Sequence, residues 1–210
     1  MGVKERKARE FQRREADILD AAYHLLTTME PMQMTMEMVA EQAEIGRGTI
    51  YKHFKSKDEI YAHLIIRRRN LLIERMKTVA SDGVEGIPRL IRSYLDYCLA
   101  DPIAYTVHRR CEHNCSRANL GKDLIDALRK QQVEKNDVIA TIMQDALGKN
   151  ITKESAPVYS DYAAWGMLRG AVDGMMENWF DDPIIDPKKY CQIVERMLLD
   201  GILPRSDRDN

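Results

Sequence analysis

The stretch from Thr35 to Lys57 constrains the fold more than any other part of the chain. Thr35 is a good N-cap because its hydroxyl can accept from the unpaired N–H groups of a first helical turn, and apolar residues then recur along one side as far as Ala43. Glu44-Ile45-Gly46 predicts a bend, and a second helix is expected from Arg47 to Phe54. Two short helices joined by so tight a turn are typical of a helix-turn-helix.

The second of these helices is expected to have two faces. Ile50 and Phe54 stand four residues apart, so both side chains should point to a core. Its other positions carry donors at the helix start and on the exposed side, which are residue types that contact base edges and phosphates. We therefore predict contacts with double-stranded DNA from Thr35, Arg47, Gly48, Thr49, Tyr51, Lys52 and His53.

Residues Gly48 to Glu59, Gly-Thr-Ile-Tyr-Lys-His-Phe-Lys-Ser-Lys-Asp-Glu, resemble the signature of the tetracycline-repressor (TetR/AcrR) family. The resemblance covers roughly residues 11–70. Two positions depart from the family pattern, since Glu44 stands where the family often has glycine and Gly46 where it often has a serine N-cap. The family lysine that matches Lys57 touches phosphate, so the resemblance adds Lys57 to the predicted DNA-binding residues.

An all-α fold is expected, because apolar residues recur at helical spacing, proline and glycine separate the segments, and no strand pattern appears. The resemblance divides the chain into a helix-turn-helix DNA-binding domain over residues 11–70 and a helical effector-binding and dimerisation domain over residues 71–210. Ser56 and Glu59 predict a capping box at the start of a helix. Besides the two short helices, helices are expected over residues 10–29, 56–79, 88–100, 102–116, 120–146 and 155–180, and from residue 186.

Composition and charge agree with a soluble globular chain, which is 44% apolar and 31% charged. The longest apolar runs fall far short of the about 18 residues of a membrane span, and the basic N-terminus has no apolar region for a signal peptide, so we expect a cytoplasmic protein. Residues 1–14 hold six Lys and Arg against two Glu. This basic start either follows a phosphate backbone or is a solvated, frayed terminus.

Aromatic side chains with polar tips gather in the C-terminal part, as they do in pockets that bury and orient a small molecule. The alternative is a filled core with satisfied hydroxyls. The predicted effector pocket consists of Tyr94, Tyr97, Cys98, Tyr105, His108, Cys111 and Trp165.

Glycines stand four residues apart in the penultimate helix, where each costs about 1 kcal/mol relative to alanine. Some close contact is expected to need them, and the family dimerises through its last two helices. Close packing inside the subunit is the alternative. The predicted dimer interface consists of Gly166, Gly170, Gly174, Met197 and Leu198.

Other patterns favour ordinary structural roles. Cys111 and Cys115 lie one helical turn apart with His113 between them, but His113 lies on another side of the helix, so two buried thiols are favoured over a metal site, and a thiol sensor stays open. The three consecutive residues Arg67 to Arg69 point in three directions, which favours a solvated helix face. No catalytic motif is present, and neither a metal nor a cofactor is predicted.

The resemblance implies a homodimeric transcriptional regulator, most simply a repressor that binds a palindromic operator and is released by a small-molecule effector. The alternative from another class is a helical protein-interaction module without sequence-specific DNA binding. An enzyme with a helical fold is a more distant alternative.

Overall fold

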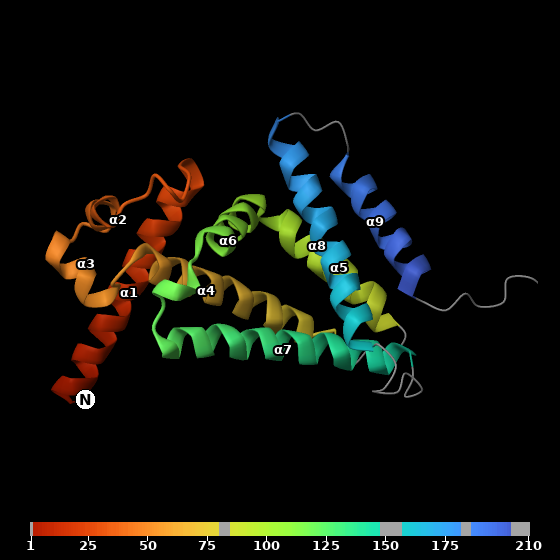
Figure 1. Cartoon of the computed structure of the whole chain (residues 1–210), viewed down its shortest axis with the longest axis horizontal. Coiled ribbons are helices and arrows are strands. Elements are labelled where there is room, and N and C mark those ends of the chain that lie inside the picture. Colours follow the sequence, from red (N-terminus) through yellow and green to blue (C-terminus); the bar gives the residue numbers. More distant parts are fainter. Residues whose placement is uncertain (1, 80–84, 148–156, 182–185, 203–210) are drawn as a thin grey trace, which may run out of the picture. The chain divides into compact units, whose positions relative to one another are not determined.

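The computed structural model describes residues 2–79, 85–147, 157–181 and 186–202. Over these ranges all regular secondary structure is helical (Figure 1), which confirms the expected fold class. The helices are α1 (Val3–Thr28), α2 (Met36–Gln42), α3 (Arg47–His53), α4 (Lys57–Lys77), α5 (Gly86–Ala100), α6 (Pro102–Asn114), η2 (Arg117–Asn119), α7 (Lys122–Leu147), α8 (Pro157–Asp181) and α9 (Pro187–Ile202).

The observed helix boundaries lie close to the expected ones, with two differences. Helix α1 begins at Val3 rather than at residue 10, because its first residues are mostly Lys, Arg and Glu, which favour a helix without adding to an apolar stripe. The turn η2 was not predicted, since three residues are too few to show a period. Residues 80–84, between the helices expected over 56–79 and 88–100, lie outside the described residues.

The chain forms two compact units. Unit 1 comprises Met1–Asn70 and Ile103–Gln131, and unit 2 comprises Leu71–Pro102 and Gln132–Asn210. The predicted boundary after residue 70 coincides with an edge of unit 1, but α6 and the first part of α7 also belong to the unit that contains the helix-turn-helix. The division into a DNA-binding and an effector-binding domain remains a prediction.

Unit 1 has one hydrophobic core, to which every α-helix of the unit contributes. Helix α2 packs against both α1 and α3. Ile50 and Phe54 are 0% and 1% exposed, as the spacing of four predicts. Helix α6 and the chain that follows it add apolar side chains, which is why they belong to this unit: Val107, Cys111, Leu120 and Leu128.

In unit 2, α5 packs against α8 and α9, and α8 packs against α9 (Figure 1). The Tyr94 and Trp165 rings meet at 4.7 Å between centroids, and the Tyr190 hydroxyl of α9 donates to the Ala171 carbonyl oxygen of α8 at 3.0 Å. Asp186 caps α9 by accepting from two backbone N–H groups, as Asp186-Pro187 predicts. No helix within the described ranges has both the length and the apolar character needed to cross a bilayer.

Candidate nucleic-acid interface

Helix α2 starts as the sequence predicts. The Thr35 hydroxyl oxygen accepts from the Met38 N–H at 3.2 Å, which satisfies one of the unpaired donors of the first turn. At the other end, the Ile45 N–H donates to the Ala40 carbonyl oxygen at 2.9 Å, and the Glu44 N–H donates to Glu41 at 3.0 Å. These two bonds are the Schellman arrangement, so the turn stops α2 sharply and leads directly to α3.

Glu44 has a strained backbone conformation in this turn. Its φ is 53°, in the left-handed region that costs an L-residue about 1–2 kcal/mol. Gly46, by contrast, has a φ of −65° and a ψ of 144°, an extended conformation that any residue can adopt. Of the two departures from the family signature, only the one at Glu44 carries backbone strain.

We predict that Glu44→Gly raises the free energy of unfolding by about 1 kcal/mol, because glycine adopts a positive φ without a steric penalty. Glu41→Gly is the matched control. Glu41 is exposed in α2, so the same substitution there should lower the free energy of unfolding by about 1 kcal/mol. Urea unfolding of both variants measures the two changes, and equal signs would contradict the assignment of strain to Glu44.

Helix α3 is divided into a buried and an exposed face. Arg47, Gly48, Tyr51 and Lys52 are exposed, whereas Thr49 and His53 are half-buried. Tyr51 is 48% exposed, and its hydroxyl donates to Glu37 of α2 at 3.4 Å. Four of the six residues predicted in α3 thus lie on its exposed face.

Lys57 lies in an unexpected environment at the start of α4. Its Nζ donates to the carbonyl oxygens of Pro31 and Met32 at 3.3 and 3.5 Å, and the Tyr61 hydroxyl donates to Pro31 at 2.7 Å. Lys57 therefore helps to fix the loop between α1 and α2. No sequence pattern could reveal this, since the partners are backbone atoms far away in the chain. The contact with phosphate stays a prediction.

The capping box at α4 differs in one partner from the expected one. Ser56 Oγ accepts from the Glu59 N–H at 3.4 Å, as predicted. The Glu59 carboxylate accepts from the Lys55 N–H at 2.7 Å instead of from Ser56. The box thus reaches one residue further toward α3 than the usual motif does.

The end of α3 also contacts the N-terminal part of α1. The rings of Phe11 and His53 are 4.2 Å apart between centroids, and Phe11 is 46% exposed. The Phe11 ring is therefore only partly covered, although its spacing to Ile18 and Ala22 places it on the apolar stripe of α1. The basic start of α1 is helical from Val3, not frayed, and this contact places α1 beside the end of α3.

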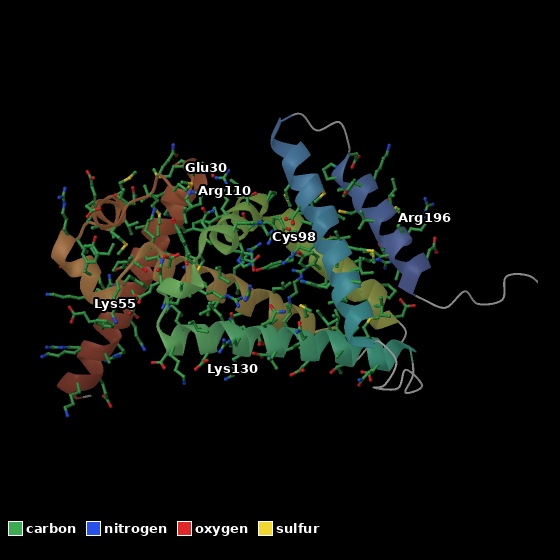
Figure 2. All side chains as sticks on the ribbon, in the orientation of Figure 1. Glu30, Lys55, Cys98, Arg110, Lys130 and Arg196 are labelled. Atoms are coloured by element: carbon green, nitrogen blue, oxygen red, sulfur yellow. The ribbon has the colours of Figure 1, made fainter. Side chains whose placement is uncertain are left out.

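Helix α6 and the residues that follow it are joined to the helix-turn-helix side of unit 1 by polar bonds. The Asp58 carboxylate accepts from the Ser116 N–H and from the Asn119 side-chain amide, both at 2.7 Å. Arg110 and Glu30 form an ion pair of 3.1 Å, and the two side chains lie side by side in Figure 2. The segment that begins with α6 is thus tied both to the start of α4 and to the end of α1.

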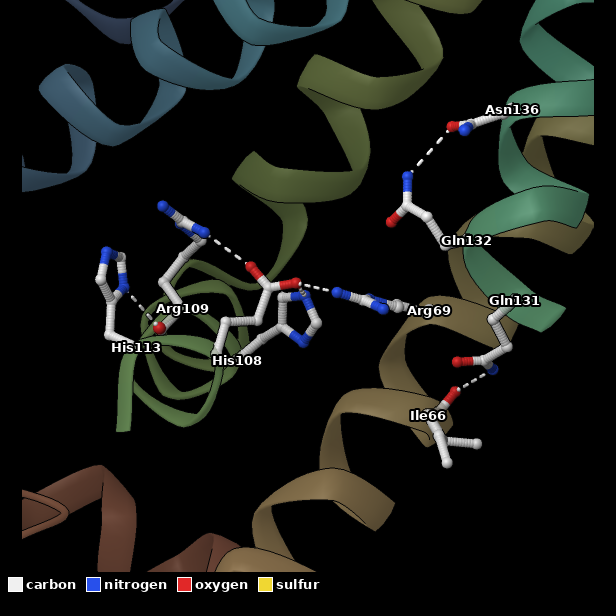
Figure 3. Close-up of polar contacts among 9 residues, drawn as sticks. Ile66, Arg69, His108, Arg109, His113, Gln131, Gln132 and Asn136 are labelled. Atoms are coloured by element: carbon white, nitrogen blue, oxygen red, sulfur yellow. Dashed lines mark hydrogen bonds and ion pairs between the residues drawn. The ribbon is translucent and has the colours of Figure 1, made fainter. Parts of the chain in front are cut away.

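Glu112 of α6 adds contacts with three side chains, Arg69, His108 and Arg109, which are labelled in Figure 3. Its carboxylate pairs with Arg69 of α4 and with Arg109, each at 2.6 Å, and His108 Nε2 lies 3.5 Å away. Burial alone would raise the pKa of Glu112, but the hydrogen bonds and charges of His108 and Arg69 outweigh it and hold the pKa well below its usual range. The expectation of a solvated arginine face is therefore wrong for Arg69, which is 17% exposed.

The residues of the predicted effector pocket fall into both units. In unit 2, Tyr94 and Cys98 are buried, Tyr97 is half-buried, and the Lys135 ammonium lies 4.8 Å from the centre of the Trp165 ring. The others belong to unit 1, where Tyr105 and Cys111 are buried and His108 is half-buried. The pocket as a whole remains a prediction.

Cys111 in α6 and Cys115 directly after it lie in surroundings that suppress the thiolate. Burial, with smaller contributions from Cys115 and Glu112, raises the pKa of Cys111 to about 12. Burial also raises the pKa of Cys115, whose Sγ donates to the Asp58 carbonyl oxygen at 3.5 Å. All four cysteines are free, and the described side chains include no group of His, Cys, Asp and Glu that could hold a metal ion.

The predicted dimer residues differ in their surroundings. A Cβ added at Gly166 or Gly170 would meet no described atom within 4 Å, and one at Gly174 would meet the Tyr190 hydroxyl at an ordinary 3.9 Å. Close packing inside the chain therefore does not explain the first two glycines. Met197 is 69% exposed, whereas Leu198 is 7% exposed and packs within its own chain.

Comparison with known proteins agrees with this geometry. Residues 18–64 match the family model described as bacterial regulatory proteins of the tetR family. The helix-turn-helix transcriptional regulator YhgD of Bacillus subtilis is 35% identical over 68 residues, which are 32% of this chain and 34% of YhgD. The regulator AcrR of Shigella flexneri is 23% identical over 199 residues, which are 92% of this chain and 91% of AcrR.

Solved structures share the fold over nearly the whole chain. NalD, the secondary repressor of the MexAB-OprM multidrug efflux pump in Pseudomonas aeruginosa, has a TM-score of 0.66 at 15% identity and covers 94% of this chain and 100% of its own. The regulator FadR of Bacillus subtilis, in complex with stearoyl-CoA, has a TM-score of 0.63 at 22% identity and covers 90% and 99%.

The helical fold and the short helices α2 and α3 are those of a bacterial helix-turn-helix regulator. The helix-turn-helix region, residues 18–64, belongs to the TetR family. The match covers about a third of the length of YhgD, whereas the match to AcrR covers 91% of the length of AcrR.

Proposed function

We propose that the chain is a cytoplasmic transcriptional regulator that binds double-stranded DNA through α3. The observation that carries the proposal is the exposed face of α3, which holds Arg47, Tyr51 and Lys52 while Ile50 is buried. An exposed helix with donors at its N-terminal end is the element that a helix-turn-helix places in the major groove. The family match over residues 18–64 supports the same role.

The regulator acts as a homodimer and as a repressor that a small molecule releases. Two recognition helices about 34–36 Å apart read a palindromic site in successive major grooves. Support for a dimer comes from α8 and α9, where Gly166 and Gly170 are open and Met167, Ile193 and Met197 are 57%, 48% and 69% exposed. Support for ligand release comes from similar proteins, since NalD is a repressor and FadR holds stearoyl-CoA.

A gel-shift with the DNA that flanks the coding region tests the proposal. Arg47→Ala is expected to weaken specific binding by about 1–3 kcal/mol, and to relax the preference at one operator position, if Arg47 addresses a guanine edge through both N–H groups. Lys57→Ala is expected to weaken binding to all sequences alike and to lower the salt slope by about one ion.

Two measurements keep these variants interpretable. Lys130→Ala removes an exposed lysine of α7 (Figure 2) and is the charge-matched control, which should leave operator affinity unchanged. Urea unfolding of Lys57→Ala separates loss of the Pro31 contact from loss of a phosphate contact. If Arg47→Ala and Lys57→Ala bind as the wild type does at every salt concentration, α3 does not enter the groove.

A further inference from the structure

The ion pair between Arg69 of α4 and Glu112 of α6 differs from a surface pair in its burial. The side chains are 17% and 15% exposed, and the atoms are 2.6 Å apart. Exposed pairs contribute about 0–1 kcal/mol, whereas removing one partner of a buried pair leaves an uncompensated charge and is strongly destabilising. The pair therefore holds α6 to α4, and it separates at low cost only where each group finds another oppositely charged partner.

Arg69 depends on Glu112 for its counter-charge more than Glu112 depends on Arg69. Glu112 also pairs with Arg109 at 2.6 Å and lies 3.5 Å from His108 Nε2, so it would keep two neighbours if Arg69 left. Within the described part of the chain, Glu112 is the only carboxylate ion-paired with Arg69. Arg69 thus requires another anion whenever it separates from Glu112, and this requirement restricts the chemistry of whatever separates them.

We propose, on the basis of the function proposed above, that the effector is an acid whose carboxylate or phosphate group replaces Glu112 as the partner of Arg69. Exchanging one anion for another keeps the guanidinium paired and costs little. A neutral or cationic molecule would leave Arg69 partly buried without a counter-charge. The atom His108 Nδ1, which is buried and has no hydrogen-bond partner among the described residues, is a further polar group for the acid.

The exchange has a direct consequence for DNA binding. Helix α4 begins at Lys57, four residues after the end of α3 at His53, so a bond that fixes α4 against α6 also fixes the recognition helix. Moving Arg69 from Glu112 to the effector removes this bond and leaves no buried charge unpaired. An acid can therefore weaken DNA binding without unfolding unit 1.

The first test measures whether Arg69 accepts an external acid, and it needs no DNA. Glu112→Ala removes the natural carboxylate and leaves space for acetate. We expect acetate to raise the Tm of this variant by about 3–6 °C at ten times its dissociation constant, relative to chloride at equal ionic strength and to neutral acetamide. Inorganic phosphate in a parallel titration distinguishes a phosphate preference from a carboxylate preference. Adding Arg69→Met to the variant should abolish the rise.

The second test uses variants that should respond in opposite directions. In Glu112→Gln a neutral amide holds Arg69 less tightly than a carboxylate does, so acetate should release DNA at about tenfold lower concentration than for the wild type. Arg69→Met should release DNA equally in acetate and in chloride. A merely structural role would weaken DNA binding in both variants without changing the response to acetate. Glu112→Gln also serves in the stability assay if Glu112→Ala does not fold.

The outcomes separate the two proposals. Equal effects of acetate, phosphate and chloride on the Tm of the Glu112 variants would overturn the acidic effector, whatever the DNA assay shows. If the wild type fails to bind the flanking DNA while acetate still stabilises Glu112→Ala through Arg69, the acid site stands and the proposed function fails.

Discussion

Replacing Phe54 by alanine is expected to lower the free energy of unfolding by about 3–5 kcal/mol, a large share of the about 5–15 kcal/mol that stabilises a typical domain. Phe54 is 1% exposed, directly follows α3, and meets His63 of α4 edge-on at 5.4 Å between ring centroids. Truncation removes its contacts and leaves a cavity among the helices of unit 1 that the backbone cannot close completely. Urea unfolding, followed by circular dichroism, measures the loss.

Tyr51→Ala is the matched control for this prediction. Tyr51 is an aromatic residue of the same helix but is 48% exposed, so its removal should change stability by no more than about 0.5 kcal/mol. It should still weaken DNA binding, because Tyr51 lies on the exposed face of α3. Equal destabilisation by the two variants would contradict the division of α3 into a core face and a DNA face.

The sequence predicts those parts of the fold that local chemistry determines. Thr35 and Asp186 cap helices where expected, because a capping side chain bonds to backbone only a few residues away. Ile50 and Phe54 are buried because their spacing matches the helical period. The positive φ of Glu44 follows in the same way, since the turn after α2 needs that conformation whichever residue occupies it.

Contacts between distant segments leave no such trace in the sequence. Arg67 to Arg69 suggests one solvated face, yet Arg67 pairs with Asp20 of α1 and Arg69 with Glu112 of α6. Glu112 lies between Cys111 and His113, which are residue types that bind metals. The contacts with Arg69, His108 and Arg109 are instead made by the Glu112 carboxylate. Identifying these partners requires knowing which helices pack together, and helical periodicity alone does not give that.

Replacing Gly170 by leucine is expected to raise the dimer dissociation constant by about 30-fold or more. Overpacking costs about 1–3 kcal/mol at each site, and a two-fold dimer carries the change twice. Because an added Cβ at Gly170 meets no described atom of the same chain within 4 Å, the leucine should not disturb the isolated subunit. The exposed Met167 and Met197 are the apolar side chains that a second copy would cover.

Gly170→Ala isolates the size of the side chain from its helix propensity. Alanine and leucine both favour a helix over glycine by nearly the same amount, close to 1 kcal/mol, so both variants should stabilise α8 to a similar degree. Only leucine is large enough to hold two backbones apart. Sedimentation at micromolar concentration should therefore show Gly170→Ala as a dimer and Gly170→Leu largely as a folded monomer. A monomeric wild type, or a leucine variant as dimeric as the alanine variant, would place the dimer contact away from this face of α8.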